Sequence, residues 1–242
     1  MGIKELVAVA EKKSSTENSD IETRYDFSHI FDGEYPYLAL NKVPAKTSVS
    51  DILKKNKNSK YRFSSRPSFL SDNGLTSSEK GTANHKFMEC CDFEKASMNI
   101  DEEIERLIEW QYLTEAQAEV IDKTAISEFF ESDIYSLMKN SEKLLKEYRF
   151  ITKVNCAMLD SEIPESLNEY TLVQGVADCI AILKDGIILV DFKTDKSSDE
   201  AYYKAEYSDQ LDLYSNALAK KFALPVKKKI IYSFKLRKCI EL

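Results

Sequence analysis

The chain has 242 residues, of which 43% are hydrophobic and 31% charged, and its net charge is −7. This length is ample for a compact hydrophobic core, so the fold needs neither disulfides nor a structural metal ion. No segment is apolar over the length of a membrane span, so we expect no membrane contact. The five cysteines form no Cys-x-x-Cys pair, which argues against a zinc or four-cysteine iron–sulfur site and favours the reduced thiols of a cytoplasmic protein.

The residue patterns divide the chain into three zones. Residues 1–34 are polar and poorly patterned, which predicts a flexible N-terminal arm. Residues 35–242 are predicted to form one domain, mainly helical over 35–145 and alternating strand and helix over 146–242. The predicted fold class is α/β, a mixed sheet of about four strands flanked by helices, with a helical N-terminal region.

Residues 52–71 are basic, with six Lys or Arg residues and no acidic residue. Tyr61 and Phe63 lie among them, and such a combination can bind a single nucleic-acid strand through phosphate contacts and base stacking. The predicted contacts are Lys60, Arg62 and Arg66. A solvated loop explains the same composition equally well, so both interpretations stay open.

Two capping boxes, Thr76-x-x-Glu79 and Thr114-x-x-Gln117, each predict the start of a helix. His85 then lies in the third turn of the first helix. A histidine in such a position is more often a core or surface residue than a metal ligand, and spacing offers it no second ligand nearby. The acidic residues between 101 and 131 predict a solvated outer face or a partner surface.

Two apolar runs, at 173–183 and 187–193, are predicted to be antiparallel strands. The dipeptide Asp185-Gly186 between them is a strong hairpin signal, because a type I′ turn needs positive φ at both central residues. The second run is apolar at four successive positions, as expected for a strand covered on both faces.

This hairpin carries the charged residues that indicate a function. In the register set by the predicted turn, Ile180 pairs with Asp191 and Asp178 pairs with Lys193. Asp178, Asp191 and Lys193 then project from one face, with the Cα atoms of the two aspartates roughly 7 Å apart. Two carboxylates at that separation can hold one hard cation between them.

Such a site fits metal-dependent phosphodiester hydrolysis. The Phe192 carbonyl would add a third oxygen, and Mg²⁺ prefers oxygen ligands. Lys193 would orient the attacking water or stabilise the pentacovalent state. Taken alone, Asp-x-Lys at a strand end is more often a solvated edge or a surface ion pair. Here the charges interrupt strongly apolar runs, and a bound cation would stabilise the buried carboxylates.

The C-terminal part predicts an amphipathic helix followed by a strand. Apolar and aromatic residues recur at three- and four-residue steps from Tyr207, with Gln210 and Tyr214 one turn apart on or beside the buried stripe. Without further information, Tyr214 is more simply a core residue. A strand at 230–234 should run parallel to the strand at 187–193, by the right-handed crossover rule.

The segments "LVQGVADCIAILKDGIILVDFKTDK" and "YSDQLDLYSNAL" together resemble the RecB-type branch of the PD-(D/E)XK nucleases. More closely, they are similar to the C-terminal nuclease domain of the AddA subunit of bacterial AddAB helicase-nucleases. The upstream segments "YPYLALNKVPAKTSVSDILKK", "RPSFL", "LTSSEKGTANHKFMECCDFE" and "YLTEAQAEVI" extend the likeness. The resemblance covers most of the chain and implies a restriction-endonuclease-like fold over 35–242.

The resemblance also implies a role for each matching residue. Asp178 and Asp191 would be metal ligands together with the Phe192 carbonyl and His85, and Lys193 would be the catalytic lysine. Gln210 and Tyr214 would form the helical motif, and Glu147 would be the upstream acidic residue, with Glu142 and Glu131 as close alternatives. Phe192 replaces a Tyr common in the family, which changes no ligand because only the carbonyl is used.

The implied function is a Mg²⁺-dependent nuclease, with Mn²⁺ as a substitute, that cuts single-stranded DNA in double-strand break repair and recombination. The implied partners are DNA, an AddB-type partner protein and the helicase region of the same subunit. The chain has no G-x-x-x-x-G-K-[ST] loop and so no ATPase motor of its own. Two alternatives remain: a catalytically silent nuclease-like module that binds DNA or docks on a helicase, and a metal hydrolase with a small substrate.

Overall fold

The computed structural model describes residues 38–56, 75–160 and 162–242. The predicted arm at 1–34 and the predicted DNA contacts Lys60, Arg62 and Arg66 lie outside these residues. Residues 40–242 cluster as one compact unit.

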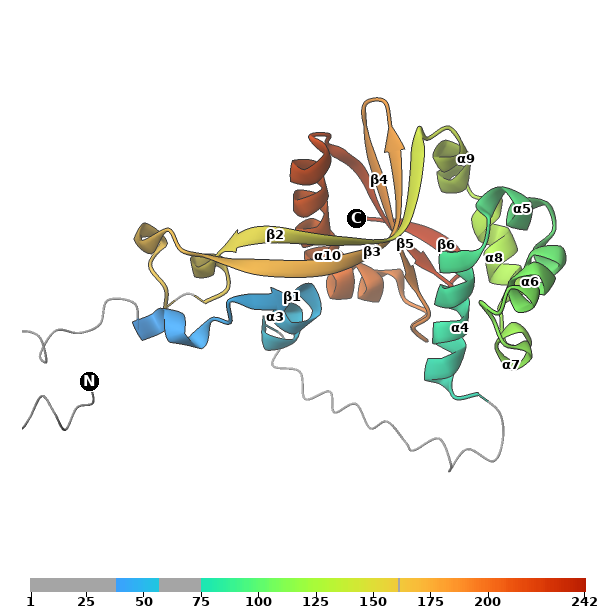
Figure 1. The fold of residues 1–242 in the computed structure, drawn as a ribbon, viewed down its shortest axis with the longest axis horizontal. Helices are drawn as coiled ribbons and strands as arrows, with labels where there is room; N and C mark the ends of the chain where they lie inside the picture. Colours follow the sequence, from blue (N-terminus) through green and yellow to red (C-terminus); the bar gives the residue numbers. More distant parts are fainter. Residues whose placement is uncertain (1–37, 57–74, 161) are drawn as a thin grey trace, which may run out of the picture. The chain divides into compact units, whose positions relative to one another are not determined.

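Within the described residues, a six-stranded mixed sheet has the order β1-β3-β4-β5-β6 (Figure 1). The long strand β3 pairs with β2 along one edge and shares its other edge between β1 and β4. β4 and β5 are parallel, as predicted, whereas β3 and β4 are antiparallel. The strands are β1 (Lys46–Ser48), β2 (Lys143–Asn155), β3 (Tyr170–Leu183), β4 (Gly186–Lys193), β5 (Val226–Ser233) and β6 (Lys238–Glu241).

Helices cover both faces of the sheet, so the predicted mixed sheet flanked by helices is confirmed. Both predicted capping boxes are formed, at Thr76 and Thr114. The longest helix, α10, begins after its N-cap Asp199 and ends at Ala223, which adopts a left-handed conformation. The helices are α3 (Val49–Asn56), α4 (Ser77–Cys90), α5 (Phe93–Met98), α6 (Ile100–Glu109), α7 (Glu115–Ala118), α8 (Lys123–Phe130), α9 (Asp133–Lys139) and α10 (Glu200–Phe222), with short 3₁₀ turns at Leu38–Lys42, Cys156–Met158 and Glu165–Leu167.

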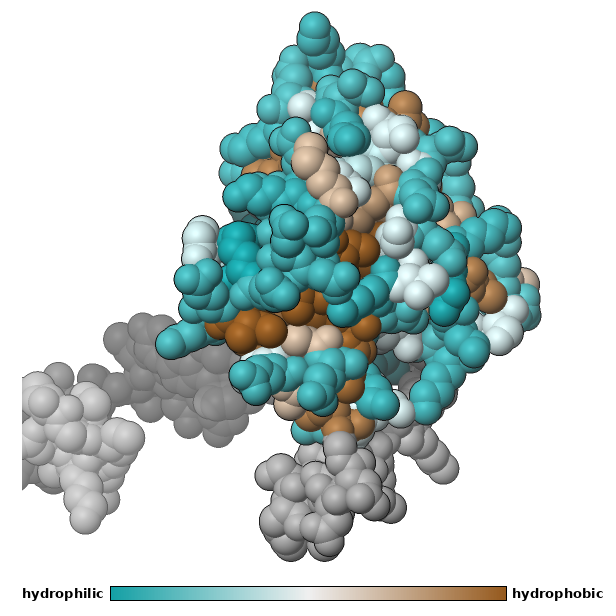
Figure 2. Space-filling model, turned by 90° about the vertical axis from the view of Figure 1, so that its right-hand side faces the viewer, coloured by the Kyte–Doolittle hydropathy of each residue, from teal (hydrophilic) through white to brown (hydrophobic). Residues whose placement is uncertain are grey.

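The sheet separates two hydrophobic cores. One core joins the sheet to helices α4–α9, and the other joins it to α3 and α10. Successive β4 residues alternate between them, so that Leu189 faces α10 while Val190 faces α4–α9. This explains why β4 is apolar at consecutive positions, since both of its faces are covered. The outer face of the α4–α9 layer is mostly hydrophilic, with hydrophobic side chains visible between polar ones (Figure 2).

The turn between β3 and β4 corrects the predicted register. The loop residues are Lys184 and Asp185, with Leu183 paired to Gly186, and neither loop residue has positive φ, so the turn is not type I′. Gly186 lies inside the strand because a Cβ there would come 2.9 Å from the Pro225 carbonyl oxygen. The register is shifted by two residues, and an even shift preserves which side chains share a face.

Two further predictions about the sheet were wrong. Helix was predicted through Leu145, but α9 ends at Lys139 and residues 143–145 pair with β3. The described sheet also has more strands than the predicted four, because β1 and β6 are present. These strands have three and four residues, which is too short for a period of two to be recognised.

In the part of the chain that the structure describes, no helix is long and apolar enough to cross a membrane.

Candidate active site

The end of β4 holds a buried ion pair against α10. The Asp191 side chain is only 2% exposed, and its Oδ2 lies 2.7 Å from Nζ of Lys193. Gln210 of α10 donates a hydrogen bond from Nε2 to the other carboxylate oxygen, Oδ1, over 3.3 Å. Oδ2 makes no hydrogen bond among the described residues, although it is fully buried. A buried carboxylate oxygen whose one partner is an ammonium is a strong candidate for a cation ligand.

Asp178 reaches the same site from the place where β3 and β4 separate. The last pair of the β3–β4 ladder is Cys179 with Val190, so the next residues along, Asp178 and Asp191, face each other across the opening. The predicted partner of Asp178 was Lys193, and the two-residue register shift accounts for the difference. Oδ2 of Asp178 accepts a hydrogen bond from the Phe192 amide over 2.8 Å.

Phe192 divides its roles between backbone and side chain. The N–H and C=O of one residue in an extended strand point to the same side. Because the Phe192 amide donates to Asp178, its carbonyl also faces the opening between β3 and β4. The ring points away and packs against Phe129 and Phe234 in the core beside α4–α9. The backbone of Phe192 is therefore available to the site while its side chain holds the fold together.

The alternation of side chains along β3 breaks at Asp178. Ala177 and Ile180 both belong to the core beside α10, although three positions separate them. In the facing strand β2, Glu147 lies at the register position opposite Asp178 and has φ of 45°, a left-handed conformation that is uncommon for Glu. The two strands thus change phase together, and three carboxylates, those of Glu147, Asp178 and Asp191, come from neighbouring positions on three strands.

The crowded carboxylates perturb one another. The pKa of Asp178 is raised well above its usual value, first by burial and next by the charge of Asp191. Burial also raises the pKa of Glu147, with a further contribution from Glu89. Burial acts to lower the pKa of Lys193, but the charges of Asp191 and Asp178 outweigh it and raise that pKa. Lys193 is therefore a protonated ammonium at neutral pH.

His85 approaches the site from α4. Its Nδ1 lies 3.6 Å from Oδ2 of Asp178. Burial, assisted by the charge of Lys193, lowers the pKa of His85, so its imidazole is neutral at pH 7 and able to act as a ligand. The helix can pack closely because a Cβ at Gly81 would lie 2.6 Å from Oγ1 of Thr194, just beyond β4.

Tyr214 lies one turn after Gln210 on the same helix and is 5% exposed. Its ring packs edge-on against Phe150 of β2, with centroids 5.1 Å apart. The charge of Asp191 acts on its hydroxyl, although burial is the main cause of its raised pKa. Tyr214 is thus both a core residue and a neighbour of the charged cluster, so the two interpretations of the sequence are compatible.

Two further residues complete the site, and the sequence did not single them out. The Lys193 ammonium lies 4.3 Å from the centroid of the Tyr207 ring, a cation–π contact. The Tyr207 hydroxyl donates to Oδ2 of Asp195 over 2.7 Å. Tyr207 precedes Gln210 by three residues and Asp195 follows Lys193 by two, so the helical period and the spacing along the strand contained the signal.

Among the described residues, no three His, Cys, Asp or Glu side chains are arranged ready to hold a metal ion. The potential ligands are instead held as two pairs, Asp191 with Lys193 and Asp178 with the Phe192 amide. The unbonded Oδ2 of Asp191 and the mutual repulsion of the two aspartates both fit a cation between them.

A family model described as the PD-(D/E)XK nuclease superfamily matches residues 57–239. The chain therefore belongs to this superfamily, whose members generally use divalent metal ions. Curated relatives named as the AddA component of an ATP-dependent helicase/nuclease include those of Clostridium beijerinckii, 34% identical over 88% of this chain, and Clostridium kluyveri, 32% identical over 83%. A third, from Clostridium botulinum strain Okra, is 31% identical over 98% of the chain.

The resemblance drawn from the motifs is thus confirmed. The chain spans 19%, 17% and 20% of the length of these relatives, in the same order, or about a fifth. A solved structure that aligns with 80% of this chain and 73% of its own has a TM-score of 0.31 and 13% identity, too distant to support an argument.

Proposed function

We propose that the chain is a Mg²⁺-dependent nuclease that hydrolyses phosphodiester bonds of single-stranded DNA. The observation that carries this proposal is the buried cluster of Asp178, Asp191 and Lys193, in which Oδ2 of Asp191 has no hydrogen bond. The membership of the nuclease superfamily gives the reaction class, and the relatives' names suggest DNA repair as the setting.

The residues present fit a hard divalent cation. Oxygen ligands would come from Asp178, Asp191 and the Phe192 carbonyl, with the neutral His85 imidazole beside them. Mn²⁺ would also suit this set, because it tolerates mixed oxygen and nitrogen ligands. The bound cation supplies a more acidic water and neutralises charge on the phosphate.

The reaction needs one water molecule and one phosphodiester. The water oxygen bonds to phosphorus, the bond from phosphorus to one sugar oxygen breaks, and that sugar oxygen leaves with a proton. Because Lys193 is protonated at neutral pH, it cannot act as the base. Its ammonium stabilises the negative charge of the phosphate and orients the attacking water. Gln210 and Tyr207 hold Asp191 and Lys193 in place.

Glu147 and Tyr214 stand behind the cluster in this proposal. Glu147 is the third carboxylate beside Asp178, and its raised pKa makes it suited to hold or pass a proton. Tyr214 excludes water from the Asp191 side of the site, since its ring is buried against Phe150.

The proposed partners are DNA, the helicase region that the relatives' names imply and an AddB-type protein, with the cytoplasm as the place where they meet. The alternative is a catalytically silent module that only binds DNA or docks on a helicase. The intact set of Asp178, Asp191 and Lys193 argues against it, because a buried charge cluster lowers stability unless a function maintains it.

The deciding experiment is a cleavage assay on end-labelled single-stranded DNA with Mg²⁺ or with EDTA. We expect cleavage with Mg²⁺ only, and Asp191→Asn should abolish it while leaving the circular dichroism spectrum unchanged. DNA binding without cleavage in Mg²⁺ would instead support the silent module.

A further inference from the structure

The sheet has a gap on one edge of β3, next to the candidate active site. β1 pairs with β3 up to Ser48 opposite Gln174, and β4 begins to pair only at Cys179. Within the described residues, positions 175–178 of β3 therefore have no strand beside them on this edge, whereas β2 covers the other edge. Asp178 forms the end of the gap that lies toward the catalytic cluster.

A cavity of about 410 Å³ opens at this gap. Gly175, Val176 and Tyr214 line it from the sheet and α10, and residues 48–50 line it from the start of α3. Gly175 lets the rings of Phe150 and Tyr214 reach the cavity, because a Cβ there would lie 2.5 Å from Cζ of Phe150. The size and the aromatic lining suit a flat ring system.

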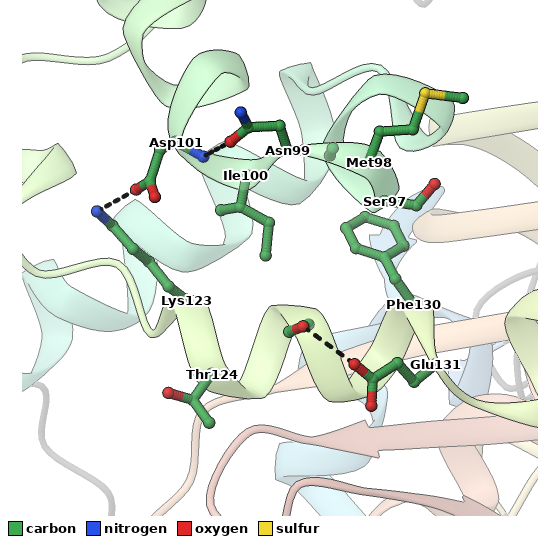
Figure 3. A pocket seen from close by; sticks show the side chains of 11 residues that line it. Ser97, Met98, Asn99, Ile100, Asp101, Lys123, Thr124, Phe130 and Glu131 are labelled. Carbon is green, nitrogen blue, oxygen red and sulfur yellow. Dashed lines mark hydrogen bonds and ion pairs between the residues drawn. The ribbon is translucent and has the colours of Figure 1, made fainter.

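The charge of the lining is unusual for this acidic protein. Arg149 is the one charged residue among the described residues that line the cavity, and no acidic residue is among them. The cavity between α5, α6 and α8, by contrast, is lined by Asp101, Glu131 and Lys123 (Figure 3). A negatively charged ligand is therefore repelled less at the gap than at that second cavity.

Backbone groups of β3 also face the gap. The Leu172 amide donates to the Ala45 carbonyl on the β1 side over 3.1 Å. Because backbone groups alternate along a strand, those of Val176 point to the same side, where no strand of the described chain pairs with them. Val176 can thus offer one donor and one acceptor to the edge of a ligand.

We propose that this cavity binds a nucleobase of the DNA strand, from a nucleotide next to the phosphodiester that is cut. The inference rests on the proposed nuclease function and adds a subsite to it. Val176 and Asp178 are two residues apart, so the cavity lies roughly 7 Å from the catalytic carboxylate along the strand. The base packs on the apolar lining, the Val176 backbone bonds its edge, and Arg149 faces the sugar–phosphate chain.

The test uses labelled single-stranded oligonucleotides with one abasic residue moved stepwise along the strand. With the wild-type protein and Mg²⁺, the bond next to the abasic residue should be cut about tenfold more slowly than in the unmodified strand, because contacts of one base are lost. Bonds farther away should be cut at the normal rate.

A matched pair of variants locates the effect. Ser50 and Thr124 are both exposed second residues of eight-residue helices, and each lines one of the two cavities. Ser50→Trp fills the cavity at the gap, so it should cut DNA about tenfold more slowly and lose its sensitivity to the abasic residue. Thr124→Trp should behave like the wild type. All three proteins should hydrolyse bis(4-nitrophenyl) phosphate, which has no base, at equal rates.

Wild-type-like cutting by Ser50→Trp, or no dependence on the position of the abasic residue, would overturn the base subsite while the nuclease function stands. If the wild type hydrolyses neither substrate with Mg²⁺, the proposed function itself fails and the subsite falls with it.

Discussion

Lys193 shows how one residue can carry a charge in the interior of this domain. Its side chain is 17% exposed, yet the charges of Asp191 and Asp178 hold it protonated. The Tyr207 ring covers the ammonium at 4.3 Å, so its position is set by a carboxylate and an aromatic face together. A positive charge fixed in this way can stabilise a phosphate without waiting for solvent to reorganise.

Lys193→Ala should therefore abolish cleavage of single-stranded DNA while the fold survives. The expected loss is at least about a hundredfold in rate, the usual cost of removing one group that stabilises the transition state. Lys196→Ala is the control, because Lys196 lies three residues later and is exposed. Cleavage rates at saturating Mg²⁺ decide the matter, and a rate near wild type for Lys193→Ala would remove the lysine from the mechanism.

Asp178 gives a prediction about stability and pH. Its pKa is raised in the folded state, so the folded protein holds that proton more tightly than the unfolded chain. Its contribution to stability is fully present below the unfolded pKa and is lost as pH rises through the folded pKa. In EDTA, Asp178→Asn should thus unfold at about the same denaturant concentration as wild type near pH 4. Near pH 7 it should be more stable by on the order of 1 kcal/mol.

Urea unfolding of both proteins at the two pH values measures this difference. Asparagine keeps the oxygen that accepts from the Phe192 amide, so the comparison isolates the charge. Mg²⁺ should stabilise wild type but not Asp178→Asn. If the variant were less stable than wild type at pH 7 in EDTA, carboxylate repulsion would not govern this site.

At the scale of the elements, the β3–β4 turn sets the register of the catalytic strands. Gly186 lies against Pro225, the Ile187 amide donates to the Pro225 carbonyl over 2.9 Å, and Lys227 pairs with Asp185. The contact with the start of β5 therefore selects which residues form the loop. This tertiary contact prevails over the local preference of Asp-Gly for a type I′ turn.

Gly186→Ala should test that contact. The added Cβ would meet the Pro225 carbonyl oxygen at 2.9 Å, so we expect a loss of about 1 to 3 kcal/mol in the free energy of unfolding, as for overpacking elsewhere. Asp185→Ala, which removes an exposed ion pair, should cost less than about 1 kcal/mol. Urea denaturation distinguishes them, and an unchanged midpoint for Gly186→Ala would show that the turn adjusts freely.

For the whole molecule, net charge and the missing motor limit what the chain does alone. With a net charge of −7, it should bind DNA weakly, and binding should weaken further as salt rises. A flexible single strand reaches a buried site more easily than paired backbones do. Processive degradation would need a helicase and a partner protein that raise the local concentration of the strand.

We therefore predict that the purified chain cuts single-stranded DNA without ATP, and intact blunt duplex much more slowly. A time course on both substrates with and without ATP measures this. Stimulation by ATP, or equal rates on the two substrates, would contradict the prediction.

Much of the fold and part of the site follow from the sequence alone. The period of α10, both capping boxes and the parallel pairing of β4 with β5 were predicted, because each depends on neighbours close in the chain or on a general rule of handedness. Asp191 and Lys193 were expected on one side of β4, since alternation along a strand is local.

The tertiary structure alone decided the register of β3 against β4, the phase change at Glu147 and Asp178, and the contacts of Tyr207 with Lys193. It also decided that β1, from more than a hundred residues upstream, ends beside Gln174 and leaves the gap. These features depend on segments that are distant in the chain and pack against one another. Local periodicity contains no information about which of several sterically possible packings has the lowest free energy.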